Sequence, residues 1–137
     1  NSFIRGFFMA KSIIPASMRL FYEEFHFSPA VLDKGILRCS GVIGVDATTM
    51  KASVDPVTQF EQAFLSLGEV LKEAGGDYTN ILEMTTFHIG LNEHLKAFMS
   101  VKDKYIEEPY PAWTAIGVSE LAFPDALLEI RVNARIG

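Results

Sequence analysis

The most regular hydrophobic pattern in the chain predicts an amphipathic helix over residues 56–74. Asp55 is placed to cap its first turn, and two glycines at 75–76 end it. Apolar side chains recur at spacings of three and four, which gives the helix a single core face. That face consists of Phe60, Phe64, Leu67 and Leu71.

A second helix is predicted within "LNEHLKAFMSVKDKYIEEPYP", residues 91–111. Asn92 is its candidate cap, and Pro109 is expected to end it, because a proline disfavours helix at the residue before it. One side of this helix is expected to face the core. That side is formed by Leu95, Phe98, Val101 or Lys102, and Tyr105.

The last segment, "LLEIRVNARI", alternates strictly, which is typical of a strand with one buried face. Its apolar set is Leu128, Ile130, Val132, Ala134 and Ile136, and its polar set is Glu129, Arg131, Asn133 and Arg135. "NILEMTTFHIG" is rich in β-branched and aromatic residues and predicts another strand. "HFSPAVLDKG" and "GILRCSGVIGV" are expected to pair as a hairpin. "VSELAFPDALL" is expected to turn the strand that contains Trp113 back beside the final one.

The resulting order is ββαβαββ, an α+β fold in which both helices cover one face of a mixed sheet. Two helices leave the other face of the sheet uncovered. That face carries small, apolar and charged groups, which suits a contact between subunits. We therefore predict a homo-oligomer.

Composition narrows the possible partners. The chain has 137 residues and 49% hydrophobic content, enough for one domain with its own core. With 17 acidic against 12 basic residues, its net charge is -5, which argues against nucleic acid as the main partner. No segment approaches the length of a membrane span, and there is a single cysteine, Cys39. We expect a cytoplasmic protein with no membrane partner.

The common catalytic patterns are missing from the sequence. His26, His88 and His94 lack the spacing of metal ligands, so no metal site is predicted. Neither Ser40 nor Ser119 lies in a nucleophile elbow. The glycines of "SGVIGV" precede no helix that would complete a phosphate loop, and no cofactor is expected.

One candidate binding site remains, where aromatic and charged side chains are expected to lie close together. Trp113, Ala115 and Gly117 share one side of their strand. If that strand pairs with the last one, these residues lie beside Glu129 and Arg131.

Taken together, these segments resemble the Rid family (YjgF/YER057c/UK114). The resemblance is carried by "CSGVIGVD", "NILEMTTFHIG", "FMSVKDKYI", "YPAWTAIGV" and "LLEIRVNARI". It covers residues 9–137 as one domain and leaves residues 1–8 as an N-terminal extension of uncertain origin. It implies a chorismate-mutase-like fold, assembly as a homotrimer, and binding of small acids in clefts between subunits.

The better-known members of this family hydrolyse reactive enamines and imines. In them an arginine holds the substrate carboxylate, within a Pro-Ala-Arg-Ser or Pro-Ala-Arg-Thr segment. In "PAWT" that position is Trp113, which lacks the charge and the forked donors of a guanidinium, whereas Thr114 fits the pattern. The segment is similar to that of the YjgH-like branch.

Other pocket positions implied by the resemblance are also changed. Arg131 stands where a glutamate helps to position water, and Glu129 keeps the neighbouring acidic position. Phe27 replaces a tyrosine and Ala115 a cysteine, whereas Ser40 and Gly41 match the family. Ordinary 2-aminoacrylate deaminase activity is therefore doubtful for this chain.

Three functions are compatible with this pattern. The first is binding of a small acid, imine or enamine, with Arg131 as the anchor, Trp113 as a stacking wall and Glu129 as the candidate catalytic group. The second is a non-catalytic binding or regulatory trimer, favoured by the loss of both the arginine and the glutamate. The alternative for Trp113 itself is that it only packs the trimer interface. The third, endoribonuclease activity or inhibition of translation, is disfavoured by the acidic charge.

Overall fold

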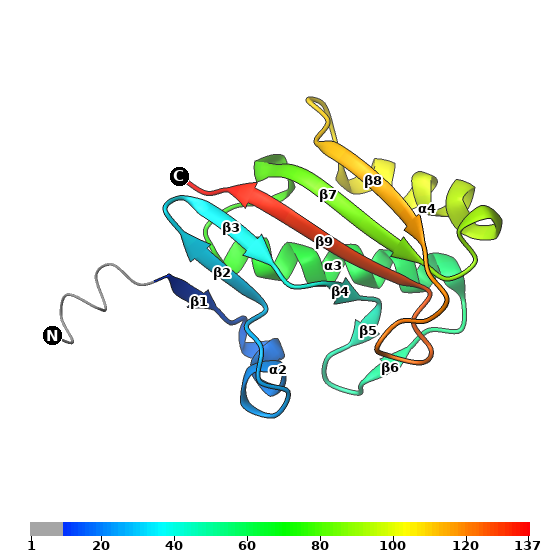
Figure 1. The fold of residues 1–137 in the computed structure, drawn as a ribbon, viewed down its shortest axis with the longest axis horizontal. Coiled ribbons are helices and arrows are strands. Elements are labelled where there is room, and N and C mark those ends of the chain that lie inside the picture. The colour runs from blue at the N-terminus through cyan, green and yellow to red at the C-terminus, as the bar shows by residue number, and fades with distance from the viewer. Residues whose placement is uncertain (1–9) are drawn as a thin grey trace, which may run out of the picture.

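The computed structural model describes residues 10–137, so the extension expected over residues 1–8 lies outside the described residues. Within them, the main feature is a mostly antiparallel sheet of seven strands (Figure 1). Six strands follow one another across the sheet in the order β1 (Lys11–Ile13), β2 (Ala30–Asp33), β3 (Ile36–Cys39), β9 (Leu128–Arg135), β7 (Ile81–His88) and β8 (Ala112–Gly117). The seventh, β4 (Val42–Ile43), also pairs with β9.

Two long helices, α3 (Pro56–Glu73) and α4 (Leu91–Tyr105), lie on one side of this sheet, behind it in the view of Figure 1. This confirms the predicted α+β architecture with both helices on one face. We call the opposite side the open face. The prediction missed five smaller elements: β1, the 3₁₀ turns Ala16–Met18 and Tyr78–Asn80, α2 (Arg19–Glu23), and the hairpin of β5 (Val45–Asp46) with β6 (Lys51–Ala52).

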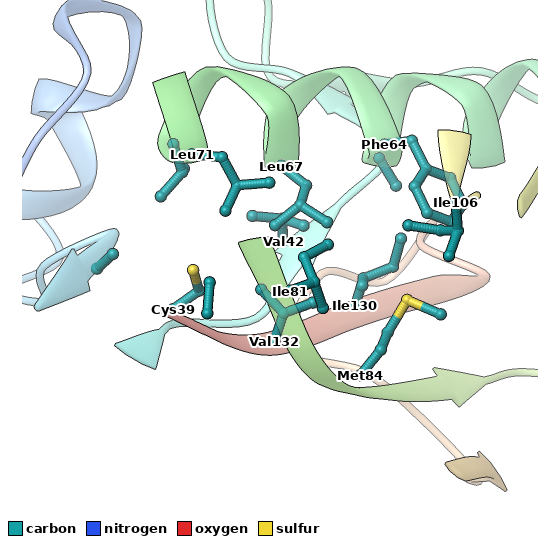
Figure 2. Packing of buried hydrophobic residues seen from close by; sticks show 14 of the residues in the cluster. Cys39, Val42, Phe64, Leu67, Leu71, Ile81, Met84, Ile106, Ile130 and Val132 are labelled. Atoms are coloured by element: carbon teal, nitrogen blue, oxygen red, sulfur yellow. The ribbon is translucent and has the colours of Figure 1, made fainter. Parts of the chain in front are cut away.

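The core lies between α3 and the sheet (Figure 2). Phe60, Phe64, Leu67 and Leu71 are all fully buried, as their helical spacing predicts. On β9, residues 128, 130, 132 and 134 are buried while their polar neighbours face the other side. The predicted alternation is therefore confirmed, and it fixes which side of β9 is open.

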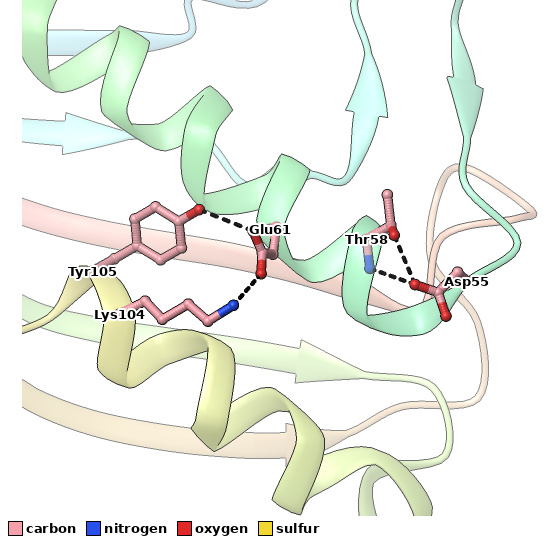
Figure 3. A network of polar contacts seen from close by, with 5 residues as sticks. All are labelled: Asp55, Thr58, Glu61, Lys104 and Tyr105. Carbon is pink, nitrogen blue, oxygen red and sulfur yellow. Dashed lines mark hydrogen bonds and ion pairs between the residues drawn. The ribbon is translucent and has the colours of Figure 1, made fainter.

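Polar contacts cap the first turn of α3 and connect this helix to α4 (Figure 3). The Asp55 carboxylate accepts hydrogen bonds from the Thr58 backbone N–H (3.0 Å) and the Thr58 hydroxyl (2.7 Å), which confirms Asp55 as the cap. Farther along α3, Glu61 accepts from the Lys104 ammonium and from the Tyr105 hydroxyl of α4. These contacts hold the helical layer together on its solvent side.

The boundaries predicted for α4 were wrong at both ends. Gly90, in a left-handed conformation (φ 67°), is the capping residue rather than Asn92, which lies within the first turn. The helix ends at Tyr105, before Pro109, and the backbone of Ile106 is extended. The Ile106 side chain is 4% exposed, so core packing turns the chain inward before the proline is reached.

The predicted hairpin between the Trp113 strand and the final strand was also wrong. β8 pairs in parallel with β7, and β9 pairs antiparallel with the opposite edge of β7. Because α4 connects β7 to β8, the crossover brings them together as parallel neighbours. β8 is consequently an edge strand, separated from β9 by the full width of β7.

The single strand expected in "GILRCSGVIGV" is divided. β3 ends at Cys39, Ser40 and Gly41 interrupt the pairing, and β4 begins at Val42. Gly44 then passes so close to the backbone of Gln59 that no Cβ would fit there. This close approach explains why the chain leaves the sheet at this point.

Two kinds of feature are absent from residues 10–137. No helix in this part of the chain has the length and apolar character needed to cross a membrane. The same residues contain no cluster of three or more His, Cys, Asp or Glu side chains that could bind a metal ion.

Candidate functional site

A largely apolar pocket of about 280 Å³ lies where β3 gives way to β4. We call it the aromatic pocket. One wall comes from α2 and the segment after it, another from β4 and β5, and a third from the loop between β8 and β9. Its lining consists of Met18, Phe21, Phe25, Phe27, Pro29, Ser40, Gly41, Val42, Ile43, Val45, Ala47, Met50, Ser66, Ala122, Phe123 and Glu129.

Aromatic rings form the outer wall of the pocket. Phe21 and Phe27 stack with centroids 5.5 Å apart, and Phe25 lies 6.3 Å from Phe21. Phe25 is 57% exposed and Phe27 is 40% exposed, so both rings present much of their surface to solvent. A concave apolar surface of this kind, with few polar groups, is typical of a small-molecule site.

Among residues 10–137, Glu129 is the only ionisable residue in the lining. Its carboxyl group packs on Gly41 so closely that a Cβ on residue 41 would lie 2.5 Å from the carboxyl carbon. A larger residue at position 41 would displace the carboxyl group from this position. Burial, with no opposing charge, raises the pKa of Glu129 above its ordinary value. A carboxyl group whose pKa is raised by burial is a stronger proton acceptor than the same group in water.

The raised pKa of Glu129 predicts a pH dependence of stability. Because the folded state binds the proton more tightly than the unfolded state, wild type loses stability as pH rises from the unfolded pKa through the folded pKa. Glu129→Gln lacks this effect. We expect the variant to gain stability relative to wild type over that range, measured by urea unfolding at several pH values. If the difference in unfolding free energy between the two proteins did not change with pH, that result would contradict a raised pKa of Glu129.

Four residues singled out in the sequence meet in this pocket: Phe27, Ser40, Gly41 and Glu129. The Ser40 hydroxyl donates a hydrogen bond to the Ser28 carbonyl oxygen at 2.7 Å. Its oxygen therefore retains lone pairs that can accept from a ligand. Ser40 and Gly41 form the break between β3 and β4, which lies beside Glu129 of β9, and Phe27 reaches the same pocket from the segment after α2.

Trp113 lies elsewhere and packs on the helical side of the sheet. Its indole N–H donates to the Thr86 hydroxyl at 2.9 Å, and its ring lies 5.9 Å from the Phe98 ring. The Lys102 ammonium lies 4.9 Å from the indole centroid, within cation–π range. The N–H is therefore already bonded and both neighbours belong to α4, which favours packing over ligand stacking within one chain.

Arg131 faces the side opposite to Trp113. In the register of the sheet, Trp113 is in line with Met84 and Val132, whereas Arg131 is in line with Thr85 and Thr114. Residues in one row point to the same face. The expectation that Trp113, Ala115 and Gly117 lie beside Glu129 and Arg131 was therefore wrong, because β7 separates the two strands. Arg131, Thr114 and Ala115 do not line the aromatic pocket.

The sequence reasoning missed a buried polar pair next to Trp113. His88 is fully buried, and its Nε2 lies 2.7 Å from the Thr86 hydroxyl oxygen that also binds the indole. Burial, reinforced by His94, lowers the pKa of His88, so the ring stays neutral. Neither residue lines the aromatic pocket, so we assign the pair to packing.

The reasoning also missed most of the pocket wall. Phe21, Phe25, Phe123, Met18 and Met50 line the pocket but were not named from the sequence. One signal was available: "LFYEEFHF" carries three phenylalanines within seven residues around a short charged helix. Its rings cannot all be buried by such a short element, which indicates an exposed aromatic surface.

Comparison with known proteins places this geometry in a family. The family described as "Endoribonuclease L-PSP" matches residues 20–136. The chain belongs to the Rid (YjgF/YER057c/UK114) family. It is 33% identical over 130 residues to the RutC family protein YjgH of Escherichia coli K12, covering 91% of this chain and 94% of that protein. This agrees with the YjgH-like segment around Trp113.

Other relatives carry more specific names. A goat protein named 2-iminobutanoate/2-iminopropanoate deaminase is 32% identical over 96 residues, 69% of each chain. The solved structure of protein YJGH has a TM-score of 0.85 at 32% identity and covers 93% of this Rid chain and 96% of its own. A Rid protein from Yersinia pestis gives 0.81 at 25% identity, covering 93% and 100%.

Proposed function

We propose that this Rid protein binds a small imine in the aromatic pocket and hydrolyses its C=N bond, with Glu129 as the proton-transferring group. The observation that carries the proposal is the position of Glu129, a half-buried carboxyl of raised pKa in an apolar pocket that otherwise lacks ionisable groups. Relatives named as imine deaminases support the reaction class.

The chemistry requires one water and one proton-transferring group. The ionised Glu129 carboxylate accepts a proton from a water molecule as the water oxygen attacks the imine carbon. The resulting acid returns that proton to the nitrogen, which gives a carbinolamine. The Glu129 carboxylate then takes the hydroxyl proton and transfers it to the amino nitrogen, so that the C–N bond breaks, ammonia leaves and the carbonyl group forms. Overall, imine and water give carbonyl compound and ammonia, and Glu129 is regenerated.

The pocket lining supports both binding and protonation. A protonated imine is a cation, and a carboxylate in an apolar setting attracts it more strongly than the same group in water. Ser40 offers an acceptor for the imine N–H, and the phenylalanines exclude bulk water. These interactions do not need the arginine that Trp113 replaces.

The direct test is ammonia release from an imine generated in place by an oxidase, measured with and without this protein. We expect acceleration over the uncatalysed reaction. A second candidate, binding without turnover, is favoured by the replacement of the arginine by Trp113. Saturable binding of an imine analogue with no acceleration would select that candidate and reject the hydrolase.

We further propose that three copies assemble through the open face of the sheet. Uncovered apolar side chains there, including Val31, Ile36, Phe87 and Ile116, lie among Arg38, Arg131 and Glu83. Ile43 and Glu129 point to the same face. A neighbouring copy would therefore border the aromatic pocket, as a cleft between subunits requires. The cytoplasmic location expected from the sequence stays a prediction.

A substitution on the open face should separate the copies. On this face Phe87 is in line with Glu129 and Ile116, so Phe87→Glu places a charge where subunits would meet. We expect wild type to sediment at three times 15.2 kDa and the variant to shift toward 15.2 kDa. The control is Leu65→Glu, on the solvent side of α3, where Leu65 is 51% exposed. A monomeric wild type at micromolar concentration would contradict the assembly.

A further inference from the structure

We infer that the substrate of the aromatic pocket is the imine of an arylalkylamine, with an aromatic ring and no carboxylate. This inference rests on the proposed function and specifies its substrate class. Three features of the pocket carry it: the charge of its lining, the identity of its walls, and its volume.

The charge of the lining disfavours an acid. No lysine, arginine or histidine lines the aromatic pocket among residues 10–137, and its one ionisable group is the acid Glu129. A ligand carboxylate there would meet a like charge and would lose its hydration without a partner. A protonated nitrogen of the ligand is favoured instead, because it pairs with the Glu129 carboxylate. The apolar lining strengthens this attraction relative to water.

The other cations that lie near this part of the same chain do not change this balance. Arg131 shares a strand and a face with Glu129 but does not line the pocket. Lys102 lies on the helical side of the sheet, with its ammonium at the Trp113 ring and 3.4 Å from an Asp103 carboxylate oxygen. Neither residue replaces the missing arginine within the pocket.

The walls favour an aromatic group. Four phenylalanines, Phe21, Phe25, Phe27 and Phe123, surround the space, and Met18 and Met50 add polarizable thioethers that adapt to flat rings. A cavity of about 150 Å³ lined by apolar residues is large enough for benzene. At about 280 Å³, this pocket has room for a phenyl ring and a short chain that ends at Glu129.

The test compares two imines that differ only in a carboxylate. An amine oxidase converts 2-phenylethylamine to the carboxylate-free imine, and an amino-acid oxidase converts phenylalanine to its 2-imino acid. We expect the protein to hydrolyse the first with kcat/KM at least about tenfold higher, the effect of one unfavourable charge contact. Equal or faster hydrolysis of the imino acid would overturn the inference while leaving the hydrolase intact.

A binding measurement separates the substrate class from turnover. By calorimetry, 2-phenylethylamine should bind wild type, and 3-phenylpropanoate should not. Glu129→Gln should weaken amine binding by about tenfold or more, since the ion pair is lost. If the amine binds as expected but neither imine is accelerated, the hydrolase fails and the ligand class stands. Preferential binding of the propanoate would overturn the ligand class itself.

Discussion

Glu129→Gln should lower the rate of imine hydrolysis at least about 100-fold, because the amide can neither accept a proton from water nor return one to nitrogen. The pocket should keep its shape, since glutamine has nearly the same volume and needs no charge partner. Ammonia release under single-turnover conditions measures the effect directly, without a contribution from product release.

Two comparisons make this result specific. Glu120→Gln is the matched control, because Glu120 is an exposed acid on the β8–β9 connection and does not line the pocket. It should retain the wild-type rate. Urea unfolding should show that Glu129→Gln is at least as stable as wild type near neutral pH, because burial raises the pKa of Glu129. A Glu129→Gln variant with full activity would remove Glu129 from the mechanism.

Gln59→Leu should destabilise the fold by about 3 kcal/mol. Gln59 is 1% exposed, and its amide donates to the carbonyl oxygens of Ser53 and Asp125 (both 3.1 Å) while accepting from the Leu127 N–H (2.6 Å). Leucine fills the space but removes the partner of these three backbone groups, whose bonds to Gln59 are part-buried. The free energy of unfolding in urea measures the loss.

Gln62→Leu is the matched control on the same helix, because Gln62 makes one bond, to the Ser66 hydroxyl (3.2 Å), and is half-buried. Its loss should stay below about 1 kcal/mol. The Gln59 bonds also fasten the loop that carries Phe123 into the aromatic pocket. Equal effects of the two substitutions would contradict the role of Gln59 as a clamp between α3 and that loop.

Local patterns predicted the parts of the fold that depend on one segment at a time. The strict alternation of residues 128–136 identified both faces of β9, and the helical spacing of Phe60 to Leu71 identified the core face of α3. The neighbour of β8 could not be predicted in this way. A strand with this sequence fits either an antiparallel hairpin or a parallel crossover, and only the path of α4 decides between them.

The residues of the candidate site that were predicted correctly came from the family resemblance. Phe27, Ser40, Gly41 and Glu129 converge as a pocket, whereas Trp113 and Arg131 were placed together by a strand pairing that does not exist. The phenylalanines of the wall were missed because apolar residues near a short helix are ordinarily read as core. Their exposure follows from the shortness of α2, a five-residue helix with no buried residues.

Methionine methyl NMR during titration with 2-phenylethylamine tests the central claim most directly. Met18 and Met50 line the aromatic pocket, Met84 lies beside Trp113 in the sheet, and Met99 is on the exposed side of α4. Saturable shifts of Met18 and Met50, with Met84 and Met99 unchanged, are the predicted result. Shifts centred on Met84 would instead place the ligand at Trp113, and an absence of saturable shifts would contradict ligand binding in the pocket.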